Sequence, residues 1–327
     1  MLKNYIKIAW RNLFRNKGFS ITNLLGLTIG MTCTMLILFW VKDELSYDKF
    51  HPNYKNIYQV IANRDFKNQV YTDRNMVLPL ASALKATYPQ IKNAVVTTYN
   101  EKHVLASGET KLTKSGFMAS DQFFDMFYWK YLRGYPSSAI KDPSSIILTE
   151  SAAKAFFGNA DPMNKIIRLD DNINLKVSAI IADPPGNSTF QFDFIKPFDY
   201  SDDRTKRSMN EWVNSSWMVY ILPLPGTSLT LLTKNINELK KKHDPNDHVS
   251  TYFLFPMSKW RLYSDFKDGK NTGGMIEYVR LFSIIAVIIL LTACVNFMNL
   301  STARSEKRAK EVGIRKTLGS EKRQLVF

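Results

Sequence analysis

The sequence is poor in cysteine, and neither of its two cysteines lies in the long polar middle of the chain. Cys33 and Cys294 both fall inside apolar runs, so the segment from Lys42 to Arg280 contains none. A disulfide framework is therefore excluded for this segment. We expect its fold to be stabilised by the packing of a hydrophobic core.

Two stretches, residues 19–41 and 281–303, lack ionisable side chains altogether. At about 1.5 Å of rise per residue, a helix of such a length extends about 34 Å and can cross roughly 30 Å of bilayer hydrocarbon. Each stretch therefore predicts a transmembrane helix. A cleaved signal peptide is a poor alternative for the first one, because the apolar run is too long and no A-x-A-like site follows it.

Acidic residues are missing from the segment that precedes the first apolar stretch. It contains five basic residues and no acid, whereas residues 304–327 contain eight basic and three acidic residues. Because Lys and Arg beside a span are retained on the cytoplasmic side, both flanks are predicted to be cytoplasmic and the middle of the chain periplasmic. Most of the net charge of +15 lies in these two flanks, where contact with the lipid bilayer explains it. Because no basic-aromatic module is present, we expect no nucleic-acid partner.

The sequence also lacks the common motifs of catalysis and nucleotide binding. It contains no G-x-x-x-x-G-K-[ST], no G-x-S-x-G and no H-E-x-x-H, so we expect neither an enzyme nor a bound cofactor. In residues 243–248, HDPNDH, two histidines bracket two aspartates. A metal site is one interpretation, but Pro and Asn favour a polar turn, and no metal site is predicted. His51 and His103 have no evident partner in the sequence.

The middle of the chain predicts a mixture of strands and helices. In residues 175–181, apolar residues alternate with Lys176 and Ser178, as is typical of a half-buried strand. Thr149 is predicted to cap the helix that follows it, and Gly158 to end that helix. Residues 201–207 are interpreted as a charged surface loop. The predicted strands are 57–62, 95–99, 146–148, 175–181 and 217–222, and the predicted helices are 80–88, 121–127, 150–157 and 228–243.

The predicted fold class is a membrane protein in which two transmembrane α-helices flank an α+β extracytoplasmic domain. Residues 2–17 place apolar and basic side chains on opposite sides of a helix, which suits an amphipathic helix in the cytoplasmic interface. The predicted domains are an amphipathic helix over 1–18, a transmembrane helix over 19–41, a core domain over 42–278, a second transmembrane helix over 279–303 and a cytoplasmic segment over 304–327.

Small residues in the first span suggest contact with another helix. Gly26 and Gly30 form a G-x-x-x-G pair, which allows a close helix approach, although an incidental pair of glycines is the alternative. After the second span, residues 303–319 favour a helix that is interrupted at Gly313 and ends at Gly319. This tail is either a basic flank of the span or a helix that docks on a soluble partner.

Three segments resemble the permease subunits of ABC transporters of the MacB/FtsX type. They are RNLFRNKGFSITNLLGLTIGMTCTMLILFWVKDELSYDKFHPNYKNIYQV at 11–60, DPSSIILTESAAKAFFGNADPMNKIIRL at 142–169, and EKRAKEVGIRKTLGSEKRQLV at 306–326. The middle segment is similar to the MacB-like periplasmic core domain. The likeness covers essentially the whole chain.

The resemblance implies a permease of the bacterial inner membrane that works by mechanotransmission. ATP hydrolysis by a partner ABC ATPase subunit would move the periplasmic domain and drive export or extraction of a substrate, which no residue identifies. ATP would bind the partner and not this chain. Residues 42–54 would form a stalk, and residues 304–327 would begin the FtsX-like permease domain. The residues that would couple to the ATPase are Glu311, Val312, Gly313, Ile314, Arg315, Lys316, Leu318 and Gly319.

Members of this family have at least four spans, so the resemblance implies that the chain is a fragment and that a second permease copy or repeat accompanies it. The alternative is a two-span membrane receptor with a periplasmic sensor domain. Such a receptor needs a cytoplasmic output module, and residues 304–327 contain no sustained heptads. The tail motif favours the permease.

Overall fold

A computed structural model of the chain describes residues 17–317 and divides into two compact units. One unit combines the N-terminal part up to Leu45 with the C-terminal part from Glu277, and the other comprises Ser46–Ile276. Almost all of the amphipathic helix predicted for residues 1–18 lies outside the described residues, as do Leu318 and Gly319.

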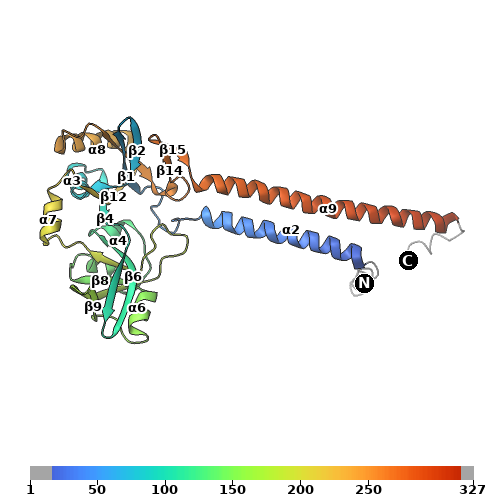
Figure 1. The fold of residues 1–327 in the computed structure, drawn as a ribbon, viewed down its shortest axis with the longest axis horizontal. Coiled ribbons are helices and arrows are strands. Elements are labelled where there is room, and N and C mark those ends of the chain that lie inside the picture. Colours follow the sequence, from blue (N-terminus) through green and yellow to red (C-terminus); the bar gives the residue numbers. More distant parts are fainter. Residues whose placement is uncertain (1–16, 318–327) are drawn as a thin grey trace. The chain divides into compact units, whose positions relative to one another are not determined.

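The first unit consists of two long helices, α2 (Lys17–Glu44) and α9 (Met275–Thr317), the second of which starts at the end of the other unit (Figure 1). Within them, Leu24–Glu44 and Met275–Asn299 are long and apolar enough to cross a membrane. Large apolar side chains on both helices are exposed, Phe39 to 65% for example. Such surfaces suit lipid and not water.

The prediction that Gly313 interrupts the second helix is wrong, because α9 continues through it to Thr317. Glycine keeps the N–H and C=O groups that the helical ladder needs. It costs a helix only about 1 kcal/mol relative to alanine. A long helix tolerates that cost.

The unit Ser46–Ile276 is built around a 13-stranded sheet, with a separate two-stranded hairpin of β14 and β15. The strands are β1 (Tyr58–Phe66), β2 (Gln69–Asp73), β3 (Met76–Val77), β4 (Ile91–Thr97), β5 (Glu101–Ser107), β6 (Thr110–Ala119), β7 (Tyr131–Gly134), β8 (Ser145–Thr149), β9 (Ile166–Leu169), β10 (Ile173–Ile181), β11 (Phe194–Pro197), β12 (Ser215–Pro223), β13 (Ser250–Pro256), β14 (Asp265–Lys267) and β15 (Lys270–Gly273). The helices are α3 (Leu80–Thr87), α4 (Phe123–Met126), α5 (Pro136–Ala139), α6 (Glu150–Phe157), α7 (Asp203–Met209), α8 (Leu229–His243) and the short 3₁₀ helix η1 (Met257–Lys259).

One half of the sheet has the strand order β13-β1-β12-β4, with every pair antiparallel. With α3 following β1 and α8 following β12, this is the β-α-β-β-α-β arrangement of ferredoxin-like folds. Successive side chains of a strand point to opposite faces. Val219 and Ile221 accordingly pack in the cluster that contains Leu84 of α3 and Leu232 of α8, while Tyr220 joins a second cluster on the other face.

The other half of the sheet closes on itself. The strands β6, β11, β8, β10, β9 and β5 are hydrogen-bonded in that order, and β5 pairs back onto β6. We call these strands the ring. Its apolar cluster contains Leu105, Ile146, Leu175 and Phe194 together with side chains of α6. The ring is inserted between β4 and β12, and the two halves of the sheet meet where β4 pairs with β6 at Thr97 and Ala119.

The strands and helices predicted from the sequence agree best with the structure where the sequence pattern is strong. All five predicted strands and all four predicted helices occur, with ends that differ by a few residues. Thr149 caps α6 by accepting a hydrogen bond from the amide of Ala152 at 3.3 Å, and Gly158 ends that helix with a φ of 57°. The loop predicted for 201–207 is wrong, because α7 begins there. The Asp202 side chain caps it by accepting hydrogen bonds from two amides.

Candidate functional site

The glycines of the G-x-x-x-G pair lie where α2 contacts α9. A Cβ atom added to Gly30 would lie 2.6 Å from the Cβ of Ala293, and one added to Gly26 would lie 2.7 Å from Nδ2 of Asn296. Only glycine at these two positions allows so close an approach. Near by, Thr34 donates a hydrogen bond from Oγ1 to the carbonyl of Ala286 at 3.4 Å. Packing of this pair against further helices of a larger bundle stays a prediction.

Residues 311–317 of the segment predicted to contact an ATPase form the last turns of α9. Val312 and Ile314 are exposed, to 42% and 60%. Apart from its chain neighbours and the backbone of its own helix, no described atom lies within 4 Å of a Cβ built on Gly313. An exposed glycine between two exposed apolar residues is a surface that a partner can cover. The side chains of Glu311, Arg315 and Lys316 are not described, and the contact itself stays a prediction.

The HDPNDH segment forms the turn after α8. Asp247 contacts Nζ of Lys240 through Oδ2 at 2.7 Å and accepts hydrogen bonds through Oδ1 from the amides of Val249 and Ser250. His243 stacks on the ring of Trp212 at 4.0 Å. Among residues 17–317, no group of three or more His, Cys, Asp or Glu residues is placed to hold a metal ion. The contacts of Asp247 are those of a polar turn.

The segment that follows α2 is bound to the loop between β10 and β11. The amide of Asp48 donates to the carbonyl of Asn187 at 2.9 Å, and Nδ2 of Asn187 donates to Oγ of Ser46 at 2.7 Å. Thr189 donates its amide to Oδ1 of Asp48 at 2.7 Å and its hydroxyl to Oδ2. We call Ser46, Asp48, Asn187 and Thr189 the latch. The stalk predicted for residues 42–54 is therefore hydrogen-bonded to the loop that joins two strands of the ring.

Arg261, in the segment between η1 and β14, reaches the same place. Its guanidinium lies 4.4 Å from the ring centre of Tyr47, the neighbour of Asp48. Burial raises the pKa of Asp48, and the hydrogen bonds from Thr189 and the charge of Arg261 act in the opposite direction. Segments from both ends of the core domain and from its middle thus meet around one buried carboxyl group.

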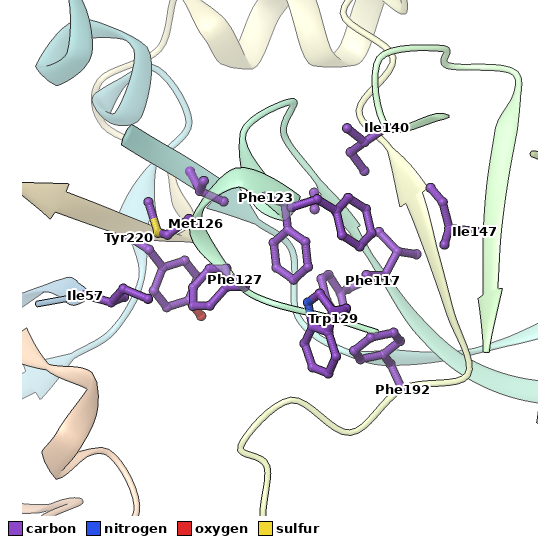
Figure 2. Close-up of a cluster of buried hydrophobic side chains, with 14 of the residues drawn as sticks. Ile57, Phe117, Phe123, Met126, Phe127, Trp129, Ile140, Ile147, Phe192 and Tyr220 are labelled. Atoms are coloured by element: carbon purple, nitrogen blue, oxygen red, sulfur yellow. The ribbon is translucent and has the colours of Figure 1, made fainter. Parts of the chain in front are cut away.

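His51, three residues further along the stalk, is buried against Phe127 and Trp129. These two side chains belong to the aromatic cluster that Figure 2 shows. The amide of Tyr128 donates to Nδ1 of His51 at 3.1 Å. Burial lowers the pKa of His51 to about 3, because the low-polarity surroundings disfavour an imidazolium. Neutral His51 therefore carries its proton on Nε2, which has no hydrogen-bond partner among the described residues.

A groove of about 400 Å³ lies beside α3 and the edge of β4. Its apolar lining includes Leu78 and Val96. Gln122, also in the lining, accepts a hydrogen bond from the amide of Ala94, so its side chain is already used to cover the strand edge. Burial raises the pKa of the Tyr200 hydroxyl to about 12, which keeps it protonated at neutral pH. None of the residues predicted to be functional lines this groove.

The sequence did not identify Asp48 and His51 as functional candidates. Both lie in the stretch that carries the resemblance, but the groups that contact them are far away in the sequence, at 127–129, 187–189 and 261. His103 likewise has a partner, Asp170, whose carboxylate lies 2.7 Å from its Nδ1. No local pattern could have predicted these contacts.

Comparison with known proteins identifies the family of the chain. Residues 20–239 match the family model described as the MacB-like periplasmic core domain. The chain belongs to this family. It is 24% identical over 322 residues to the macrolide export ATP-binding/permease protein MacB of Aggregatibacter actinomycetemcomitans, a match that covers 93% of this chain and 46% of the relative. The chain thus spans about half the length of that relative.

Two solved structures resemble the MacB-like core domain of this chain. A permease domain from Porphyromonas gingivalis is 22% identical and covers 63% of this chain and 92% of its own length, with a TM-score of 0.55, which shows a shared fold. The periplasmic region of MacB from Actinobacillus actinomycetemcomitans is 17% identical and covers 64% of this chain and 92% of its own, with a TM-score of 0.45.

The family match confirms the resemblance to MacB-type proteins and the predicted fold class. Two transmembrane helices, α2 and α9, flank an α+β domain of the MacB-like periplasmic core type. The match ends at residue 239, inside α8. The similarity predicted for residues 306–326 lies beyond it.

Proposed function

We propose that the chain is a permease subunit, or a part of one, of an ABC transporter that works by mechanotransmission. A partner ABC ATPase hydrolyses ATP in the cytoplasm, and the movement passes through α2 and α9 to the periplasmic core domain. The domain then drives export or extraction of a substrate. The chain itself carries out no catalysis.

Family membership supports this proposal. The curated relative combines ATP-binding and permease functions under one name, and that name describes macrolide export. Its substrate is its own, and no residue of this chain identifies a cargo. The family match favours a permease over a two-span receptor. We place the chain in the inner membrane with a cytoplasmic N-terminus, together with a second permease copy or repeat.

The observation that carries the proposal is the continuity of α9. This helix of 43 residues begins at Met275, directly after the last strand of the core domain, and continues without a break through the apolar span to Thr317. At about 1.5 Å per residue it is about 65 Å long. A continuous hydrogen-bonded helix can carry a displacement over that length, which a flexible linker cannot.

The test is association with the ABC ATPase produced by the native host. We expect Gly313→Trp to weaken co-purification of the ATPase about tenfold or more, because a large side chain would occupy an exposed contact surface. Membrane insertion should be unchanged. The matched control is Lys310→Trp, on an exposed position of the same helix outside the predicted contact. Undiminished co-purification with Gly313→Trp would count against the assigned contact.

A further inference from the structure

The latch joins two segments that are distant in the sequence but adjacent to important elements. Each of its side-chain bonds spans 141 residues. Ser46 follows the end of α2 by two residues, and Thr189 precedes the start of β11 in the ring by five. The chain also has a second route from α2, through residues 49–57 into β1 of the ferredoxin-like half. Beside the latch, Phe50 and His51 pack against Trp129 in the same aromatic cluster, so the segment after α2 contacts the ring side of the domain at two places.

An aspartate at position 48 lowers the stability of the fold. Its side chain is almost completely buried, and its φ of 60° lies in the left-handed region that non-glycine residues rarely adopt. Burial of a carboxyl group and a strained backbone both oppose folding. A neutral residue with an ordinary backbone would stabilise the fold more. The carboxyl group is therefore better explained by the specific contacts that it makes with Thr189.

The loop that Asp48 binds leads into the core. Two consecutive prolines, Pro184 and Pro185, fix the φ angles of their own positions at the start of this loop. After Thr189 the chain enters the aromatic cluster through Phe190 and Phe192. The aromatic ring centres of Phe192 and Trp129 are 5.0 Å apart. Figure 2 shows the two side chains next to each other. A displacement of the loop would therefore move packed side chains and would not be absorbed by a flexible segment.

We propose that Asp48 is a positioning residue that fastens the end of α2 to the ring, so that movement of α2 displaces the ring directly. The latch would transmit movement to the loop between β10 and β11, and Arg261 would keep the segment before α9 against the same point. This inference rests on the proposed function for its biological meaning. The mechanical link itself is a property of the chain alone and can be tested without an ATPase.

The experiment measures amide hydrogen exchange in the full chain, held in lipid nanodiscs. We expect Asp48→Ala to speed exchange of the Thr189 amide about tenfold or more, because its hydrogen bond to the buried carboxyl group is lost. Thr189→Val removes only the hydroxyl donor and should speed exchange in the same loop by a smaller factor. Asp199→Ala is the matched control: Asp199 accepts hydrogen bonds from the amide and hydroxyl of Ser201 in the same manner, but within an exposed local turn.

The mechanical link is tested by displacing α2 and measuring amide exchange in the loop between β10 and β11. Gly30→Leu places a large side chain against Ala293 and forces α2 away from α9, and we expect exchange in residues 187–195 to rise about fivefold or more when the latch is intact. In the Asp48→Ala or Thr189→Val background, Gly30→Leu should change that exchange less than about twofold. An equal response in the intact and altered backgrounds overturns the proposal. So does the absence of any response in the intact chain.

These outcomes are separable from the fate of the proposed function. Loss of ATPase co-purification on substitution of Gly313 tests the permease assignment and involves no residue of the latch. A positive exchange result with no ATPase partner would leave the mechanical link in place and remove the transporter assignment. A negative exchange result would leave the transporter assignment intact and remove the role of Asp48.

Discussion

Gly116 of β6 lies directly against the phenyl group of Phe194 in β11. The two residues are paired across the parallel strands that close the ring, and a Cβ atom on Gly116 would lie 2.5 Å from three atoms of the phenyl group. Phe194 is almost fully buried in the cluster within the ring. Closure of the ring therefore depends on the absence of a side chain at residue 116.

The first prediction follows from this contact. We expect Gly116→Ala to lower the free energy of unfolding of the core domain by about 1–3 kcal/mol, the usual cost of overpacking a core. Thermal unfolding followed by near-UV circular dichroism measures the change. The smaller side chain of Phe194→Leu should restore part of the loss in the double variant. Gly186→Ala is the control, since the described structure leaves open space there; equal losses at the two glycines would contradict the prediction.

A second prediction concerns the helix pair. We expect Gly30→Ala to weaken the packing of α2 on α9, because the new methyl group would lie 2.6 Å from the Cβ of Ala293. Adding Ala293→Gly should restore it. The packing is measured by the rate of disulfide formation between Thr34→Cys and Ala286→Cys in a chain whose native cysteines are replaced. The control, Gly18→Ala, has open space among the described residues. No rescue by Ala293→Gly would argue against this contact.

The third prediction is a dependence of stability on pH that originates in His51. The pKa of this histidine is about 3 in the folded chain and 6.5 when exposed. Above pH 6.5 both states are neutral and stability is unaffected. Below pH 6.5 only the unfolded chain binds the proton, so stability falls by about 1.4 kcal/mol per pH unit, or about 2 kcal/mol at pH 5.

This dependence is measured by denaturant unfolding of the chain at pH 7 and at pH 5. His51→Gln should remove the part of the loss that belongs to His51, since glutamine does not titrate. The control is His248→Gln, because the side chain of His248 is exposed. If the His51 variant lost as much stability between the two pH values as the original chain, the neutral buried histidine would be disproved.

The fourth prediction distinguishes a structural turn from a metal site in HDPNDH. Lys240 is almost fully buried and donates hydrogen bonds to the carbonyls of Asp247 and Ser250 in addition to its ion pair with Asp247. We expect Asp247→Ala to cost about 2–4 kcal/mol, because it leaves a buried ammonium group without its counter-charge. Asp244→Ala, at a partly exposed position of the same turn, should cost little.

Thermal unfolding with and without a chelator separates the two interpretations. A structural turn predicts that the chelator changes the stability of neither the original chain nor the Asp247 variant. A loss of stability in the original chain on chelation, with no further loss in the Asp247→Ala variant, would establish a metal site instead.

Features that depend on local composition were predictable from the sequence. The absence of ionisable residues in 19–41 and 281–303 predicts spans, and α2 and α9 cover both stretches. Alternation in 175–181 and the Thr149 cap likewise depend only on neighbours in the chain. Strands such as β5 and β6 were missed, because polar residues in their sequences, Glu101–Ser107 and Thr110–Ala119, weaken the apolar pattern. Their place in the ring determines that they are strands.

The sequence by itself therefore determined where the chain is apolar enough to enter a membrane, which flanks are basic and which short segments favour strand or helix. Only the tertiary structure decided that β11 closes the ring beside Gly116, that Asp48 binds Thr189 and that His51 is enclosed by aromatic side chains. The physical reason is the range of the interactions. Periodicity and charge act between near neighbours, whereas these contacts join residues that only the burial of a shared core brings together.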